Sequence, residues 1–191
     1  KIKTLGIKRN EALAIMTKSA KRFTYYWLGA AILGVRLVAL NTGLRGNVLE
    51  HQLSQSQSRL MIHDESFSDY VQLCASKVPL YSLESLENLK ISKLGSKEIF
   101  SSKPSDISCI MFTSGTSGPS KGVLMPEAHC VLFGIGTIEN YNLLATDIFY
   151  ICLPLFHANG LFMQLLASLI AGSKAVIRDR FSASCWLEDI R

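Results

Sequence analysis

The chain reads Thr113-Ser114-Gly115-Thr116-Ser117-Gly118-Pro119-Ser120-Lys121-Gly122 across one short polar segment. An apolar run over residues 107–112 precedes this segment, and a shorter one over residues 123–125 follows it. Apolar runs bounded by Gly, Pro and Ser are typical of strands joined by a turn. A flexible Ser/Gly linker has a similar composition, but it is rarely flanked by strand-like sequence on both sides. The sequence therefore predicts a strand, a loop and a second strand, with a helix beginning near Pro126.

The composition of this loop suits a phosphate group. Glycine permits positive φ and lets backbone N–H groups approach an anion closely. Hydroxyl groups donate further hydrogen bonds, and Lys121 adds a positive charge with three donors. A Walker loop counted from Gly115 does not fit, because it needs glycine where Ser120 stands and a hydroxyl residue where Gly122 stands. The dinucleotide pattern Gly-x-Gly-x-x-Gly is also absent from the segment.

The loop instead resembles the signature of the adenylate-forming (AMP-binding) enzymes, Thr-Ser-Gly-Thr-Thr/Ser-Gly-x-Pro-Lys-Gly. This superfamily includes acyl-CoA synthetases, the adenylation domains of peptide synthetases and luciferases. The chain departs from the pattern at Pro119-Ser120, where the proline stands one place early. Proline fixes φ and has no N–H, so the shift changes which backbone donor precedes Lys121.

Further stretches extend the resemblance along essentially the whole chain. Leu153-Pro154-Leu155-Phe156-His157 resembles the family's LPLFH segment. Residues 178–183 resemble the carnitine- and fatty-acyl-CoA ligase branch of the acyl-CoA synthetases. Residues 5–7, 27–29 and 34–41 are similar to the family's first lobe. The loop signature is the most specific of these matches.

The resemblance implies an enzyme that activates a carboxylate as acyl-AMP and passes the acyl group to coenzyme A. ATP, Mg²⁺ and coenzyme A would take part, with a small-molecule carboxylic acid as substrate. His157 would border the acyl site as the candidate catalytic residue, and its alternative role is that of a structural histidine in a buried loop. The resemblance assigns phosphate binding to the hydroxyl groups and the lysine of the loop, with two glycines permitting the turn: Thr113, Ser114, Thr116, Ser117, Lys121, Gly115 and Gly118.

By the same resemblance, the adenine site, the magnesium-binding glutamate and a C-terminal catalytic lysine would all lie beyond residue 191. The chain is therefore expected to be part of the N-terminal domain of an adenylate-forming enzyme, with no metal ligand of its own. The 191 residues by themselves are not expected to form acyl-CoA. A non-catalytic nucleotide-binding module derived from an adenylation domain is the alternative interpretation.

The net charge of +5 is concentrated at the N-terminus, where seven Lys and Arg residues oppose only Glu11 within the first 22 residues. A basic segment can bind nucleic acid or a membrane surface. This one has no interleaved aromatic residues, so a solvated face is favoured and no nucleic acid partner is predicted. Five cysteines, an odd number without metal or redox spacing, favour a reducing, cytoplasmic environment.

Residues 148–172 contain no Asp, Glu, Lys or Arg over 25 positions, which is long enough to span a membrane. Pro154, His157 and Asn159 interrupt the apolar character near its middle. A strand, a loop and a buried helix explain these polar residues better than a membrane span does. Membrane association is therefore the disfavoured alternative.

Alternating helix and strand patterns predict an α/β fold with parallel sheets flanked by helices. We expect a helix over 23–34, a strand over 35–40, a short helix over 48–53, a strand over 59–63, helix and loop over 64–90, and a strand over 175–177. Two later helices are indicated by aliphatic residues at helical spacing, which are Val131, Ile135 and Ile138 in one and Leu161, Leu165 and Leu169 in the other. The predicted organisation is a first α/β lobe over 1–91, a polar linker over 92–106, and the phosphate-loop segment with the start of the acyl pocket over 107–191.

Overall fold

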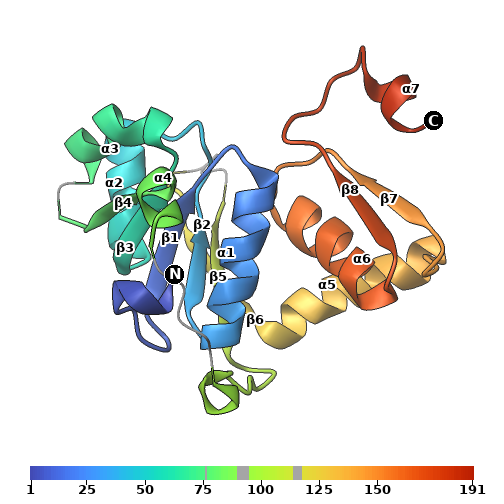
Figure 1. Cartoon of the computed structure of the whole chain (residues 1–191), viewed down its shortest axis with the longest axis horizontal. Coiled ribbons are helices and arrows are strands. Elements are labelled where there is room, and N and C mark those ends of the chain that lie inside the picture. The colour runs from blue at the N-terminus through green and yellow to red at the C-terminus, as the bar shows by residue number, and fades with distance from the viewer. Residues whose placement is uncertain (76, 90–94, 114–117) are drawn as a thin grey trace. The chain divides into compact units, whose positions relative to one another are not determined.

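A computed structural model describes residues 1–75, 77–89, 95–113 and 118–191 of the chain. These residues form two compact units, 1–127 and 128–191. Each unit contains parallel strands connected through helices (Figure 1). The predicted α/β class, with mostly parallel sheet flanked by helices, is thereby confirmed.

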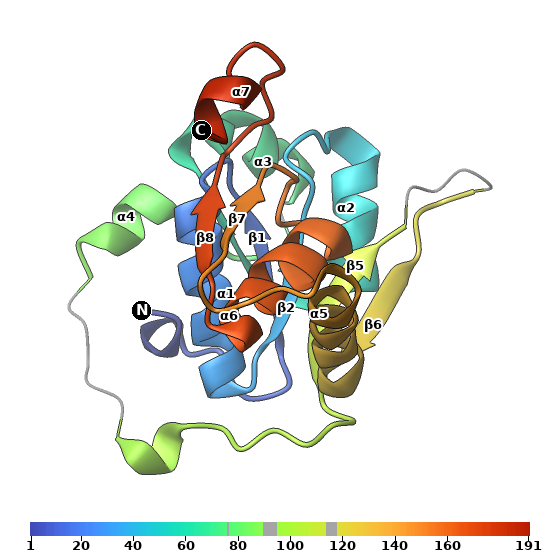
Figure 2. The ribbon, with the colours of Figure 1, turned by 90° about the vertical axis from the view of Figure 1, so that its right-hand side faces the viewer.

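The first unit is built on a six-stranded sheet with the strand order β4-β3-β1-β2-β5-β6. Its strands are β1 (Ala12–Met16), β2 (Arg36–Ala39), β3 (Ser58–His63), β4 (Leu80–Ser82), β5 (Ile107–Phe112) and β6 (Gly122–Pro126). Neighbouring strands are parallel except for β5 and β6, which run side by side in opposite directions (Figure 2). The carboxyl ends of β1 to β5 therefore meet at one edge of the sheet.

Helices cover both faces of this sheet (Figure 1). The α-helices are α1 (Ala20–Leu33), α2 (Gly46–Gln55), α3 (Ser68–Cys74) and α4 (Leu83–Glu87), and single 3₁₀ turns occur at η1 (Lys3–Leu5), η2 (Glu65–Phe67) and η3 (Ser96–Glu98). Leu49 and Leu53 of α2 and Val71 of α3 are buried together with Ala14 and Met61 of the sheet. Helix α1 lies on the opposite face and buries Phe23, Trp27 and Ala30.

Strand β1 is the part of the first unit that the sequence pattern does not predict. All five of its residues are buried, and it lies between β3 and β2. A parallel strand covered on both faces is apolar throughout, and so short a run of Ala, Leu, Ile and Met cannot be told from a buried helix segment by periodicity alone. Strand β4 falls in the region expected to be helix and loop, because a strand of three residues is too short to show a pattern.

The described part of the predicted linker, residues 95–106, belongs to the first unit and contacts its other elements. The Phe100 N–H donates to the Ile32 carbonyl at 2.8 Å, and the Arg9 guanidinium lies 4.0 Å from the centre of the Phe100 ring. Lys3 forms an ion pair with Glu98. Strand β5, which follows this segment, joins the same sheet as β1 to β4. The division into a lobe, a linker and a phosphate-loop segment stays a prediction.

The second unit contains a two-stranded parallel sheet of β7 (Ile148–Ile151) and β8 (Lys174–Ile177). The π-helix η4 (Asn159–Leu166) and helix α6 (Ala167–Ala171) connect these strands, and α7 (Trp186–Asp189) follows them. The apolar segment 148–172 is thus a strand, a loop and a partly buried helix, as predicted. Among the described residues, no helix is both long and apolar enough to cross a membrane.

Helix α5 (Glu127–Tyr141) begins directly after Pro126, as predicted, and its buried face is not the one that carries the evenly spaced aliphatic residues. Cys130, Gly134 and Thr137 are buried, whereas Val131 and Ile135 are exposed. A Cβ atom on Gly134 would lie 2.9 Å from the Ile170 side chain of α6. The small residues of α5 therefore form its contact face, because they permit close approach of α6. Of the second evenly spaced set, Leu161 and Leu165 are buried and Leu169 is exposed.

Candidate functional site

The carboxyl ends of parallel strands are the usual place for a binding site in an open α/β sheet. The chain passes from β1 through α1 to β2, and then returns through α2 to β3 on the other side of β1. The loops that follow β1 and β2 therefore lead to helices on opposite faces of the sheet. The phosphate-loop candidate follows the carboxyl end of β5 at the same edge.

Two hydrogen bonds between Thr113 and Lys121 close the base of this loop. The Thr113 N–H donates to the Lys121 carbonyl at 3.1 Å, and the Lys121 N–H donates to the Thr113 hydroxyl oxygen at 3.2 Å. Gly118 has a φ of +144°, in the range that glycine tolerates best. The Lys121 side chain is exposed. Ser114, Gly115, Thr116 and Ser117 lie outside the described residues, so their assigned roles remain predictions.

Helix α2 contacts the C-terminal part of the loop at Ser120. The ring nitrogen Nε2 of His51 lies 2.9 Å from the Ser120 carbonyl oxygen. Because a carbonyl only accepts, this nitrogen must carry a proton and donate. The Nε2 amide group of Gln52 donates to the Ser120 hydroxyl oxygen at 3.1 Å. Neither contact is foreseen from the sequence, since His51 and Gln52 lie in an unremarkable amphipathic helix and no motif marks them.

Asp64 organises the loops that follow β1 and β3. Its carboxylate accepts from the Thr17 hydroxyl group and from the Lys18 N–H, each at 2.7 Å. The Arg22 guanidinium lies 3.6 Å from the same carboxylate and donates to Glu84 at 2.6 Å. Burial alone would raise the pKa of Glu84, but hydrogen bonds from Arg22 and backbone N–H groups outweigh it, so this pKa lies below its usual value. The network fixes the carboxyl edge by polar contacts among its own residues.

In the second unit, His157 belongs to the loop that follows the carboxyl end of β7. The His157 N–H donates to the Pro154 carbonyl at 3.1 Å, and the His157 carbonyl accepts from the Leu161 N–H at 3.0 Å. The His157 side chain is exposed, and its ring lies 4.7 Å from the Phe156 ring. The backbone of this residue is thus fixed while its imidazole stays accessible. Its role beside the acyl site and its alternative role as a structural histidine both stay predictions.

Gly160 allows the start of η4 to pack against the backbone of the His157 loop. A Cβ atom at this position would lie 2.6 Å from the Pro154 carbonyl oxygen and 2.8 Å from that of Leu153. We expect Gly160→Ala to lower the free energy of unfolding by about 1–3 kcal/mol, because rigid backbone must shift to admit the methyl group. Urea denaturation of the 191-residue chain measures this effect.

Gly136→Ala is the matched control for this prediction. It lies within α5, and a Cβ atom there would meet no other atom within 4 Å. Alanine is the better helix former, so this variant should be neutral or more stable by up to about 1 kcal/mol. Equal stability of the Gly160→Ala and Gly136→Ala variants would contradict the close approach at Gly160.

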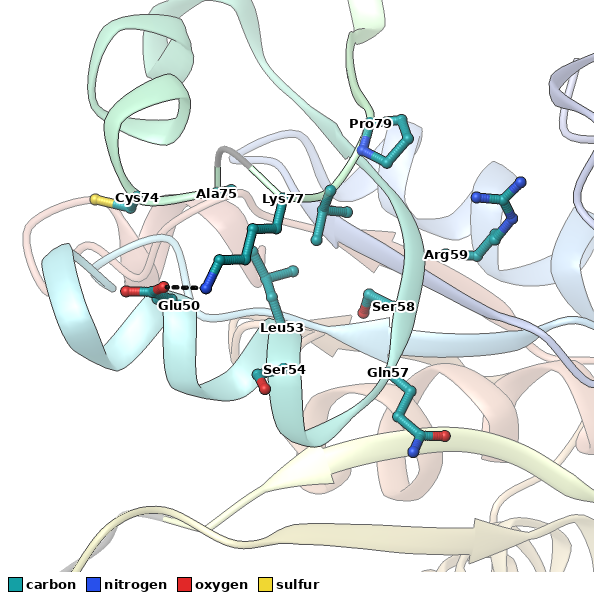
Figure 3. Close-up of a pocket in the computed structure, with 11 residues that line it drawn as sticks. Glu50, Leu53, Ser54, Gln57, Ser58, Arg59, Cys74, Ala75, Lys77 and Pro79 are labelled. Atoms are coloured by element: carbon teal, nitrogen blue, oxygen red, sulfur yellow. Dashed lines mark ion pairs between the residues drawn. The ribbon is translucent and has the colours of Figure 1, made fainter.

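One pocket of the first unit, of about 380 Å³, lies away from the candidate site (Figure 3). Ser58 and Arg59, at the amino end of β3, line one side of it, and Pro79 precedes β4 on another. The Lys77 ammonium group lies 3.9 Å from the Glu50 carboxylate across it. This pocket thus lies at the amino edge of the sheet. Within the described ranges, no group of three or more His, Cys, Asp or Glu side chains is placed to hold a metal ion.

The sequence profile of a family described as AMP-binding enzyme matches residues 2–191 of the chain. A 2-succinylbenzoate–CoA ligase of Bacillus licheniformis is 29% identical over 191 residues, which are 100% of this chain and 39% of that protein. A medium/long-chain-fatty-acid–CoA ligase of Mycobacterium marinum is 23% identical over 179 residues, covering 94% of this chain and 35% of that protein. The chain therefore spans well under half of the length of these relatives.

Solved structures of coenzyme A synthetases also match the chain. The O-succinylbenzoate coenzyme A synthetase of Bacillus subtilis in complex with AMP matches with a TM-score of 0.90 and 27% identity. The match covers 99% of this chain and 48% of that chain. The synthetase in complex with ATP and a magnesium ion matches with a TM-score of 0.88 and 27% identity, covering 99% of this chain and 39% of that one.

Proposed function

The chain belongs to the AMP-binding enzyme family, and on that premise we propose that its 113–122 loop binds the β and γ phosphates of ATP during the activation of a carboxylic acid. The observation that carries this proposal is the loop itself. It follows the carboxyl end of a buried parallel strand, its base is closed by Thr113 and Lys121, and the lysine side chain is exposed. These features match the needs of a phosphate site.

The chemistry explains why such a loop is required. A carboxylate does not react with a thiol, because it lacks a good leaving group. Attack of the carboxylate oxygen on the α-phosphorus of ATP forms a mixed anhydride, acyl-AMP, and breaks the bond to pyrophosphate. Negative charge grows on the departing pyrophosphate, so donors fixed around the β and γ phosphates stabilise the transition state. A thiol can then displace AMP from the acyl group.

Each proposed role falls on a particular residue of the loop or of the second unit. Lys121 supplies the charge-assisted hydrogen bond to a phosphate oxygen, and Thr113 orients the lysine backbone. Gly118 adopts the backbone conformation that the turn needs. His157 borders the acyl group, with its backbone held by the Pro154 carbonyl. The remaining loop positions, Ser114, Gly115, Thr116 and Ser117, would complete the phosphate contacts.

We further propose coenzyme A as the acceptor, since the relatives named above are CoA ligases. Two classes of carboxylic acid are candidates. The name of the Bacillus licheniformis relative suggests an aromatic acid such as 2-succinylbenzoate, and the sequence of residues 178–183 favours fatty or carnitine-like acids. Magnesium is assigned no ligand among the described residues, and no step above is routed through it.

Acid-dependent exchange of labelled pyrophosphate into ATP tests the proposal. The natural protein is purified from the cells that produce it. It is assayed with 2-succinylbenzoate, with medium- and long-chain fatty acids and with carnitine-like acids. We expect exchange with at least one of them, followed by thioester formation when coenzyme A is added. ATP binding without acid-dependent exchange would instead support a non-catalytic nucleotide-binding module. The 191 residues alone, assayed in parallel, should yield no thioester.

A further inference from the structure

Helix α2 contacts the phosphate-loop candidate through two hydrogen bonds to a single residue. His51 donates to the Ser120 carbonyl oxygen at 2.9 Å, and Gln52 donates to the Ser120 hydroxyl oxygen at 3.1 Å. One bond to the backbone and one to the side chain restrain both the position and the rotation of Ser120. Lys121 follows immediately, so the residue before the lysine is fixed from the helix.

The burial of Gln52 indicates that this contact is more than surface packing. Gln52 is 5% exposed and lies on the same helix as Leu49 and Leu53, which belong to the apolar core. A buried amide without a partner costs more than an apolar side chain of similar size. Its Nε2 donor is instead directed to the Ser120 hydroxyl group. The helix thus buries one polar side chain, and that side chain bonds to the loop.

Lys121 is restrained from two directions as a result. On one side, its backbone exchanges two hydrogen bonds with Thr113 at the end of β5. On the other side, Ser120 is held by His51 and Gln52. In a proline-containing version of this loop, a ring at position 120 would limit φ covalently. Here a serine occupies that position, and side-chain hydrogen bonds restrain it instead.

We propose that Gln52 and His51 are positioning residues, which hold Ser120 so that the Lys121 ammonium group meets the phosphates of ATP. The effect of this contact on the reaction rate rests on the proposed function of the loop. The hydrogen bonds between α2 and Ser120 do not depend on that function. Neither residue touches the reacting atoms in this account. Their effect on the reaction passes through Ser120 to Lys121, and a misplaced lysine loses rate even when all catalytic groups are present.

Amide hydrogen exchange in the 191-residue chain tests the contact without any ligand. Gln52→Leu keeps the volume but removes the donor, and Ser120→Ala removes the hydroxyl acceptor. We expect each variant to speed exchange at the Thr113 and Lys121 amides by about three- to tenfold, the equivalent of one neutral hydrogen bond. The double variant should show no further increase, since both changes remove the same bond. Ser120→Thr, which retains the hydroxyl group, should restore slow exchange.

Gln55→Leu is the matched control, because Gln55 lies on the same helix and is exposed. It should leave exchange at both amides unchanged. Additive effects of Gln52→Leu and Ser120→Ala would overturn the proposal, and so would unchanged exchange at Lys121 in both single variants. A fall in melting temperature alone, with no change at these amides, would show that Gln52 acts only on stability.

The effect of the contact on the reaction rate is measured separately. For this, the substitution is introduced into the gene and the natural protein is purified from the cells that produce it. Gln52→Leu should lower the maximal rate of ATP–pyrophosphate exchange by about three- to tenfold and leave the KM for the carboxylic acid unchanged. An unaltered exchange rate beside faster amide exchange would overturn the positioning role. If the unaltered protein shows no ATP–pyrophosphate exchange with any acid, the proposed function fails, while amide exchange still decides whether the helix holds the loop.

Discussion

Lys121→Ala is expected to lower the rate of ATP–pyrophosphate exchange by about ten- to two-hundredfold. A hydrogen bond between a charged donor and a phosphate contributes about 1.5–3 kcal/mol. If the bond is made mainly in the transition state, the whole of that energy appears in the rate. The side chain of Lys121 is exposed in the structure, so its removal should leave the free energy of unfolding nearly unchanged.

Lys103→Ala serves as the control for Lys121→Ala. Lys103 is also exposed and lies in the polar segment before β5, away from the loop. Its removal should alter the exchange rate by less than about twofold, because surface charges far from the reaction contribute little. Both variants are assayed with the same acid at saturating ATP. Equal rates for the two variants would remove Lys121 from the mechanism.

Asp64→Ala should lower the free energy of unfolding by about 3–5 kcal/mol. The carboxylate is largely buried, with a residue exposure of 8%, and it accepts bonds from the Thr17 hydroxyl group and the Lys18 N–H at 2.7 Å. Hydrogen bonds to a charged group contribute about 1.5–3 kcal/mol each. Loss of the acceptor would leave both donors unsatisfied and the neighbouring Arg22 guanidinium without one of its partners. Urea denaturation followed by circular dichroism measures the change.

Two further variants make the Asp64 experiment specific. Asp64→Asn keeps one acceptor oxygen and should fall between the unaltered protein and the alanine variant. Asp69→Ala removes an exposed carboxylate from the first turn of α3 and should cost less than about 1 kcal/mol. A loss below 1 kcal/mol for Asp64→Ala would show that the loops after β1 and β3 are held by other contacts.

The elements that could be predicted from the sequence are those with a strong local signal. The two strands that flank the hydroxyl- and glycine-rich segment and the start of α5 have the predicted bounds within a residue or two. Strand β1 could not be predicted, because periodicity alone does not distinguish its short apolar run of Ala, Leu, Ile and Met from a segment of buried helix. The contact face of α5 does not follow from the spacing of its large aliphatic residues, because close packing at Gly134 selects the small ones. Helix packing depends on the partner helix, which a local pattern does not contain.

The residues of the candidate site also fall into two groups, those that a local motif marks and those that only the fold brings together. Thr113, Gly118 and Lys121 could be selected because they lie within one short motif. The contacts of Ser120 with His51 and Gln52 could not, because they join residues 69 and 68 positions apart. The role of Asp64 could not be predicted either, because only the pairing of β1 with β3 brings Thr17 and Lys18 close to it. A motif contains only residues that are close in the sequence, whereas these contacts depend on how the strands pair in the sheet.

The hydrogen bond between Gln52 and Ser120 has a consequence for how sequences of this family diverge. A serine at position 120 is useful to the loop only while position 52 supplies a donor, and a buried amide at position 52 is tolerated only while position 120 offers an acceptor. The two positions should therefore change together across the lineage. A homologue with proline at the position of Ser120 would be released from this coupling and could carry an aliphatic residue at the position of Gln52.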